Sequence, residues 1–244
     1  MRDLLRWEMK QTLSSKVFWG MGIAFLLSVF LFLLGYIAEG GHSGFELYLH
    51  TMNTFNAFLI FYTGIYAGIH ITGAFETRKI QAAVMAGYSR MNILFAKLIS
   101  FAFSIAVFCM VSVTANSVIG FIAGGIDDVR DDLLTPVIIR GLVFVVVEFG
   151  YAAICMILSM LVKNLGGAIA VNFITMLILN IVTEVLIANN IAIDFLRLTP
   201  VGQSYMILYD ATPQNMMIAV TATVICVISV MTLCYLKLRK EELK

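Results

Sequence analysis

Residues 76–97, ETRKIQAAVMAGYSRMNILFAK, form a polar, charged stretch between two long apolar runs. The run before it, 54–74, contains no acidic or basic residue apart from His70, and the run after it, 98–123, is uncharged. A helix needs about 20 apolar residues to cross a hydrocarbon core that is about 30 Å thick. The sequence therefore predicts two membrane-spanning helices joined by a short segment that lies in water.

Four further stretches have the length and hydrophobicity of a membrane span: residues 17–38, 138–162, 165–188 and 216–236. Hydrophobic residues make up 61% of the 244 positions and charged residues 13%, whereas a soluble domain carries roughly 25% charged residues. The first stretch exceeds the length of a signal-peptide core, so we expect it to be retained. The prediction is an all-α polytopic membrane protein, a single domain over 1–244 with six transmembrane helices.

Basic residues gather on alternate connections between these stretches. The connections at 39–53, 124–136 and 189–215 are mainly acidic, and of the 16 Lys and Arg residues only Arg130, Arg140 and Arg197 lie on that side. The positive-inside rule therefore places both termini in the cytoplasm. The basic residues on the cytoplasmic side are Arg2, Arg6, Lys10, Lys16, Arg78, Lys79, Arg90, Lys97, Lys163, Lys237, Arg239, Lys240 and Lys244.

The polar stretch itself predicts a helix, a sharp turn and a second helix. Residues 75–86 lack Pro and Gly and are rich in good helix formers. Gly87 stands where a helix ends in a left-handed residue, and Ser89 is placed to cap a helix that opens with Arg90 and continues into the third span. Such a projecting helix suits docking in a partner's groove, while its basic residues equally suit contact with anionic lipid headgroups.

One family pattern matches these residues. Glu76, then Gly87-Tyr88-Ser89-Arg90, then Lys97 at the start of a span resembles the ABC-2 type permease family. A basic leader, six spans and a long loop with Leu198-Thr199-Pro200 before the sixth span extend the resemblance, whereas Ile80-Gln81 stands where many members have Gly-Thr. The resemblance implies a permease in the bacterial cytoplasmic membrane, with energy supplied by a separately encoded ABC ATPase.

The resemblance also implies roles for parts of the chain. The permease would form a homodimer that binds two ATPase copies, which carry the ATP and Mg²⁺, and no cofactor, metal or nucleic acid is expected on this chain. The leader 1–16 would be an interfacial helix in contact with lipid, and the loop before the sixth span would form external re-entrant helices. Segment 75–90 would be the coupling helix, with the ATPase contact made by Glu76, Arg78, Lys79, Gly87, Tyr88, Ser89 and Arg90.

Three polar residues inside the predicted spans are candidate functional residues: Glu148, His70 and Glu184. Intramembrane acids usually face a cavity, a bundle interior or a partner. Glu148, in the middle of the fourth span, is either a substrate-pathway or ion-coupling residue, or a glutamate that holds helices or subunits together. His70 is interpreted as a structural partner at the cytoplasmic end of the second span, and Glu184 as a residue that reaches water at the external end of the fifth.

Three functional hypotheses follow. The first is an ABC exporter permease without catalysis of its own, which resembles exporters involved in peptide export and antimicrobial resistance and would move an amphipathic peptide or lipophilic substrate outward. The second is an ion-coupled secondary transporter or channel that uses Glu148. The third is a membrane enzyme of prenyl or lipid transfer at 127–132, where Asp127 and Asp131 belong to an Asp-Asp-x-x-Asp pattern, although a solvated loop explains that pattern better.

Overall fold

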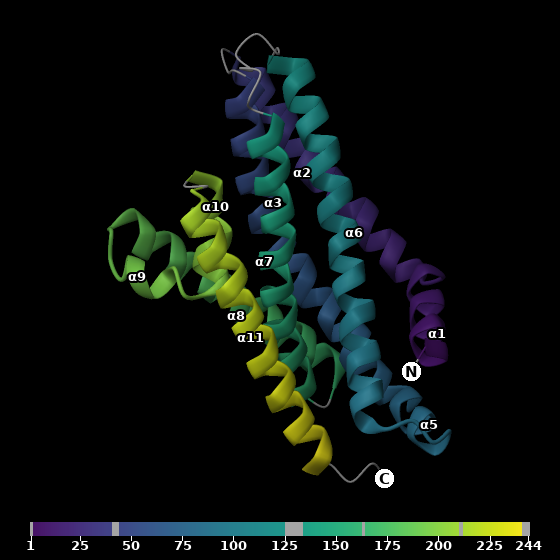
Figure 1. The fold of residues 1–244 in the computed structure, drawn as a ribbon. Coiled ribbons are helices and arrows are strands. Elements are labelled where there is room, and N and C mark those ends of the chain that lie inside the picture. Colours follow the sequence, from purple (N-terminus) through teal and green to yellow (C-terminus); the bar gives the residue numbers. More distant parts are fainter. Residues whose placement is uncertain (1, 41–43, 125–133, 163, 210–211, 241–244) are drawn as a thin grey trace.

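The computed structural model describes residues 2–40, 44–124, 134–162, 164–209 and 212–240 (Figure 1). Within these ranges the chain contains helices and no strand. The helices are α1 (Arg2–Leu13), α2 (Lys16–Glu39), α3 (Gly44–Ala67), the π-helical turn η1 (Gly68–Thr72), α4 (Gly73–Glu76), α5 (Lys79–Met85), α6 (Arg90–Gly124), α7 (Leu134–Leu161), α8 (Leu165–Ala188), α9 (Ile193–Leu196), α10 (Pro200–Tyr209) and α11 (Pro213–Lys240).

Six helices of the described chain are long and apolar enough to cross a membrane, which confirms the predicted fold class. They are Lys16–Glu39, Phe45–Glu76, Arg90–Ala115, Ile138–Leu161, Leu165–Ala188 and Pro213–Arg239. The second helix starts about ten residues before the predicted span, because Leu47, Tyr48 and Met52 lie in its first turns and are buried in the bundle. Buried apolar side chains thus continue the helix through a stretch that the sequence alone marks as a connection.

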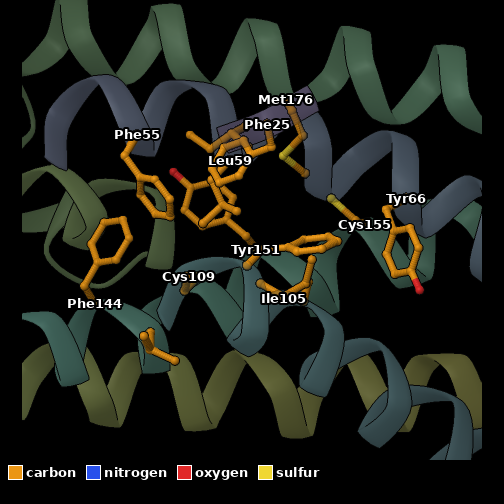
Figure 2. Packing of buried hydrophobic residues seen from close by; sticks show 14 of the residues in the cluster. Phe25, Phe55, Leu59, Tyr66, Ile105, Cys109, Phe144, Tyr151, Cys155 and Met176 are labelled. Carbon is orange, nitrogen blue, oxygen red and sulfur yellow. The ribbon is translucent and has the colours of Figure 1, made fainter. Parts of the chain in front are cut away.

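Helices α3 and α7 form the centre of the bundle. Helix α3 packs against α2, α6, α7 and α8, and α7 packs against α6, α10 and α11 (Figure 1). The core between them is aromatic: the rings of Phe55 on α3 and Phe144 on α7 face each other with centroids 5.8 Å apart (Figure 2). Only 22% of the most apolar stretch of α2, and of that of α8, is buried inside the bundle. Most of the surface of these two helices therefore faces outward, as expected for helices in contact with lipid.

The glycines of Gly64-x-x-x-Gly68 pack α3 and η1 against α8. A Cβ on Gly64 would lie 3.2 Å from the Cβ of Asn172, and one on Gly68 would lie 2.8 Å from Cγ1 of Ile169 and 3.1 Å from its backbone nitrogen. Small residues let membrane helices approach closely enough for such contacts. The motif therefore serves a contact within one chain, between the second and fifth spans.

Two short helices, α9 and α10, fill the connection before the sixth span. Helix α10 is held by buried polar contacts: Ser204 Oγ accepts from Asn56 Nδ2 at 3.2 Å and lies 3.0 Å from the hydroxyl of Tyr151. Figure 1 shows both helices below the upper ends of α3 and α6, with α9 projecting from the side of the bundle. The loop before the sixth span therefore contains helices, as predicted. Whether these helices enter the outer leaflet stays a prediction.

The close contact at Gly68 makes a testable prediction. Gly68→Ala should lower the thermal midpoint of unfolding in detergent, because overpacking a filled contact costs about 1–3 kcal/mol. Gly73→Ala is the matched control: it lies one turn further along the same span and has nothing within 4 Å of its ideal Cβ, so its midpoint should stay the same or rise. Equal effects of the two changes would contradict the assignment of Gly68 to the α3–α8 contact.

Candidate functional site

The polar segment after the second span folds into two tight corners around a short helix. The span ends where Thr77 donates its backbone N–H and its hydroxyl to Gly73 O, at 3.1 and 2.7 Å. Arg78 then adopts a left-handed conformation (φ 58°), and α5 starts at Lys79. The prediction of one unbroken helix over 75–86 is therefore wrong, because a corner at 77–78 turns α5 away from the axis of the span.

The second corner follows the sequence prediction. Gly87 has φ 87°, a conformation that costs glycine little, and Ser89 Oγ accepts the backbone N–H of Asn92 at 3.2 Å. Helix α6 starts at Arg90 and runs without a break into the third span. We call residues 77–89, with α5 between its two corners, the elbow.

Glu76 bonds within the chain at the start of the elbow. Its Oε1 accepts the backbone N–H of Leu165 at 2.6 Å, and Asn164 Oδ1 accepts that of Gly167 at the same distance. Both oxygens satisfy free N–H groups in the first turn of α8, where a negative charge also interacts favourably with the helix dipole. Glu76 therefore ties the end of the second span to the beginning of the fifth.

Arg90 makes the corresponding contact at the other end of the elbow. Its Nη1 donates to Leu238 O at 2.7 Å and to Arg239 O at 3.1 Å, in the last turns of α11. A cation there satisfies carbonyl groups that have no partner within the helix. Of the seven residues predicted to contact an ATPase, Glu76 and Arg90 therefore bond to other helices of the same chain.

One face of α5 is packed and the other is free. Ile80 is buried in a cluster with Leu4 of α1, Ala74 of α4 and Ile93 of α6. On the opposite side Met85 is 82% exposed. Arg78, Gly87 and Ser89 are exposed around it, and Lys79 and Tyr88 are partly buried.

The sequence analysis did not identify Met85 as a candidate contact residue, although a helical projection would have placed it on the exposed face of α5. Met85 lies five positions after the buried Ile80, which puts the two side chains on roughly opposite faces of the helix.

An ion pair between α1 and α6 holds the N-terminal helix beside the elbow. Lys97 Nζ lies 2.8 Å from Glu8 Oε2, and both side chains are buried. Glu8 belongs to a stripe with Leu4 and Thr12, spaced four residues apart on the buried face of α1. Sequence reasoning did not single out Glu8, and an acid on that stripe, among the basic residues of the leader, is the signal that could have identified it.

Two of the three intramembrane residues, His70 and Glu184, bond to different parts of the structure. His70, in η1, lies with Nε2 2.9 Å from Ser100 Oγ of α6, as expected of a structural partner. Ser100 Oγ donates to Lys97 O at 3.0 Å, so its one hydroxyl proton is used and the imidazole must donate. Glu184, exposed on α8, accepts the hydroxyl of Tyr205 at 3.2 Å.

Glu148 is isolated in the middle of α7. It is 0% exposed, and neither carboxylate oxygen has a hydrogen-bond partner in the described chain. An unpartnered buried polar group is costly, so such a residue calls for an explanation.

The described residues contain no group of three or more His, Cys, Asp or Glu that could hold a metal ion. Asp127 and Asp131 lie outside the described residues.

A comparison with family models identifies the family to which this chain belongs. The model described as "ABC-2 family transporter protein" matches residues 4–180, which is more than half of the chain. The chain belongs to the ABC-2 transporter family. The match runs from α1 into α8 and so includes the elbow and the Glu8–Lys97 pair, while no curated protein matches the chain. As a family member the chain is a multi-pass transport subunit and not itself an enzyme, and such permeases generally work with a separate ATPase subunit.

The buried Glu8–Lys97 pair leads to a prediction that separates the effect of charge on stability from the effect of packing. Glu8→Gln should lower the free energy of unfolding by about 3–5 kcal/mol, because it leaves the Lys97 ammonium buried without its counter-charge. Adding Lys97→Met to Glu8→Gln should recover most of that loss, since the double variant buries no charge at this contact. Denaturant unfolding in detergent measures both effects. Additive losses in the double variant would contradict a direct Glu8–Lys97 interaction.

Proposed function

We propose that this chain is the permease subunit of an ATP-driven ABC exporter in a bacterial cytoplasmic membrane, with both termini in the cytoplasm. Two copies would bind two copies of a separate ATPase, which carries the ATP and Mg²⁺. The observation that carries the proposal is the elbow: α5 presents one exposed face while its other face and both its corners are bonded to the bundle.

The elbow contacts enough of the bundle to transmit a force. It continues directly into the second and third spans, and Glu76 and Arg90 connect its two ends to α8 and α11. Helix α1 is joined to it through Leu4 and, by way of α6, through the Glu8–Lys97 pair. A push on α5 therefore acts on four of the six spans at once, and charge-assisted hydrogen bonds make three of these links short and directional.

The distribution of charge supports the orientation. The elbow, α1 and the end of α11 carry eight of the 16 Lys and Arg residues, and Figure 1 shows these elements at the same end of the bundle. Basic segments stay on the cytoplasmic side, where an ATPase would be present. The resemblance to exporters of peptide toxins, bacteriocin immunity and drug resistance favours an amphipathic peptide or lipophilic cargo over an ion.

Met85 gives a sharper test of docking than Glu76 or Arg90, because changes at those two residues would also disturb helix packing. Met85→Asp should weaken the complex with a partner ABC ATPase by about tenfold or more, since an anchor side chain in a groove contributes about 1.4 kcal/mol or more. Its unfolding midpoint should stay unchanged, because the side chain is 82% exposed.

Affinity and permease-stimulated ATP hydrolysis are measured with both chains purified in detergent. Met85→Leu is the matched control, and because it keeps the apolar surface it should retain wild-type affinity. Wild-type affinity and stimulation in Met85→Asp would remove α5 as the docking contact. A permease that binds no ATPase at all would remove the ATP-driven mechanism.

The isolated Glu148 favours one other function, ion-coupled transport, because an unpartnered carboxyl in a span is a typical ion or proton site. The two functions differ in their energy source. In inverted membrane vesicles that contain the permease and its ATPase, we expect ATP-driven transport by Glu148→Gln to persist when a protonophore removes the proton gradient. Gradient-driven transport without nucleotide that Glu148→Gln abolishes would instead establish the ion-coupled mechanism.

A further inference from the structure

A cavity of about 460 Å³ is lined by residues of α3, α8, α9, α10 and α11 and of the turns on either side of α9. Its walls combine two opposite charges, three asparagine side chains and a few apolar groups. The lining residues are Asn53, Glu184, Ile187, Ala188, Asn190, Ile193, Arg197, Tyr205, Met206 and Asn215.

The two charges in this cavity are not paired with each other. Glu184 comes from the last turns of α8 and accepts one hydrogen bond, from Tyr205, at 3.2 Å. Arg197 follows α9, and the structure has no ion pair between its guanidinium and Glu184 or another described carboxylate. The cavity thus offers an anion and a cation on separate walls to one ligand.

The walls are preformed by close backbone packing. Asn190 and Ala192 hold left-handed conformations (φ 54° and 53°) in the turn between α8 and α9. A Cβ on Gly202 would lie 2.3 Å from Leu196 O, so α9 and α10 touch without room for a side chain. The backbone carbonyl of Arg197 also accepts Gln203 Nε2 at 2.7 Å. A site held in this way loses little conformational entropy when a ligand binds.

The surface around the cavity is apolar. Ile191, Phe195 and Leu198 are 53%, 66% and 67% exposed, and the outer face of α8 below them exposes Ile181 and Val185. In a membrane protein such surfaces face acyl chains, and Figure 1 shows α9 projecting from the side of the bundle. With α9 and α10 in the outer leaflet, as the sequence predicts, the cavity would open beside lipid, and its ligand would need an apolar body as well as a charged head.

We propose that this cavity binds the headgroup of a phospholipid that carries a primary ammonium and a phosphate, an ethanolamine phospholipid. The ammonium donates to Glu184, and the phosphate accepts from the guanidinium of Arg197, which matches phosphate geometry with paired N–H donors. The acyl chains then lie along the exposed face of α8.

The lining also discriminates between headgroups. A choline ammonium has no N–H to donate and is recognised by cages of aromatic rings, whereas Tyr205 is the sole aromatic residue among those that line the cavity. A glycerol headgroup has no cation for Glu184. Of the three, the ethanolamine headgroup alone combines an N–H donor for Glu184 with a phosphate for Arg197.

The test is lipid retention measured by native mass spectrometry on the full-length chain. The chain is reconstituted in nanodiscs with equal amounts of ethanolamine, choline and glycerol phospholipids and then transferred to detergent. We expect retention of the ethanolamine lipid to exceed that of the choline lipid by about tenfold, the factor that one charge-assisted hydrogen bond supplies. No ATPase or nucleotide is present, so a failure here leaves the proposed export function intact.

Glu184→Gln should remove the preference for ethanolamine lipid, whereas Arg197→Gln should lower the retention of all three lipids, because each of them carries the phosphate that Arg197 binds. Asp194→Asn is the matched control: it removes one charge from α9, outside the cavity lining, and should keep the preference. Equal retention of ethanolamine and choline lipids by the unmodified chain would overturn the proposal, and that comparison needs no variant to fold. A preference that survives Glu184→Gln, or one for the glycerol lipid, would overturn it as well.

Discussion

Backbone hydrogen bonding inside the bilayer is the constraint on which the rest of this structure depends. Hydrocarbon offers no partner for an N–H or C=O group, so a chain crosses as helices, and each helix end near the membrane needs other partners. Here side chains supply them at three ends: Glu76 and Asn164 at the start of α8, Ser89 at the start of α6 and Arg90 at the end of α11. Two of these capping residues, Glu76 and Arg90, also join one span to another.

The elbow is packed tightly against the bundle although this constraint does not require it. Its residues could have formed a loose connector, because they lie where water is available. Instead a left-handed Arg78 and a left-handed Gly87 turn the chain within a few residues, and Ile80 buries the inner face of α5 against α1, α4 and α6. This packing matters for the coupling role that we propose for the elbow, because a contact can transmit only as much displacement as its attachment to the moving helices allows.

Much of the architecture could be predicted from the sequence, because hydrophobic runs and Lys/Arg placement follow directly from the bilayer. The sequence also predicted the turn at Gly87 and the helix cap at Ser89, since each residue type has a specific role at a helix end. The corner at Arg78 could not be predicted from the sequence, because arginine has no preference for left-handed backbone and the surrounding helix formers favour an unbroken helix. The partners of Glu76 and Arg90 lie 89 and 148 residues away, at Leu165 and Leu238, and no local pattern predicts such contacts.

The two ends of the molecule are connected through α3 and α8. These helices touch at Gly64 and Gly68, where no side chain separates their backbones, so neither can shift far without the other. At one end Glu76 joins them, and at the other Asn56 of α3 and Asn180 of α8 bond to Ser204 and Tyr205 of α10. A displacement of the elbow therefore has a continuous, closely packed route to the short helix at the opposite end of the bundle. Because α10 also forms one wall of the cavity at Glu184 and Arg197, we expect a movement of the α3–α8 pair relative to α7 to change the shape of that cavity.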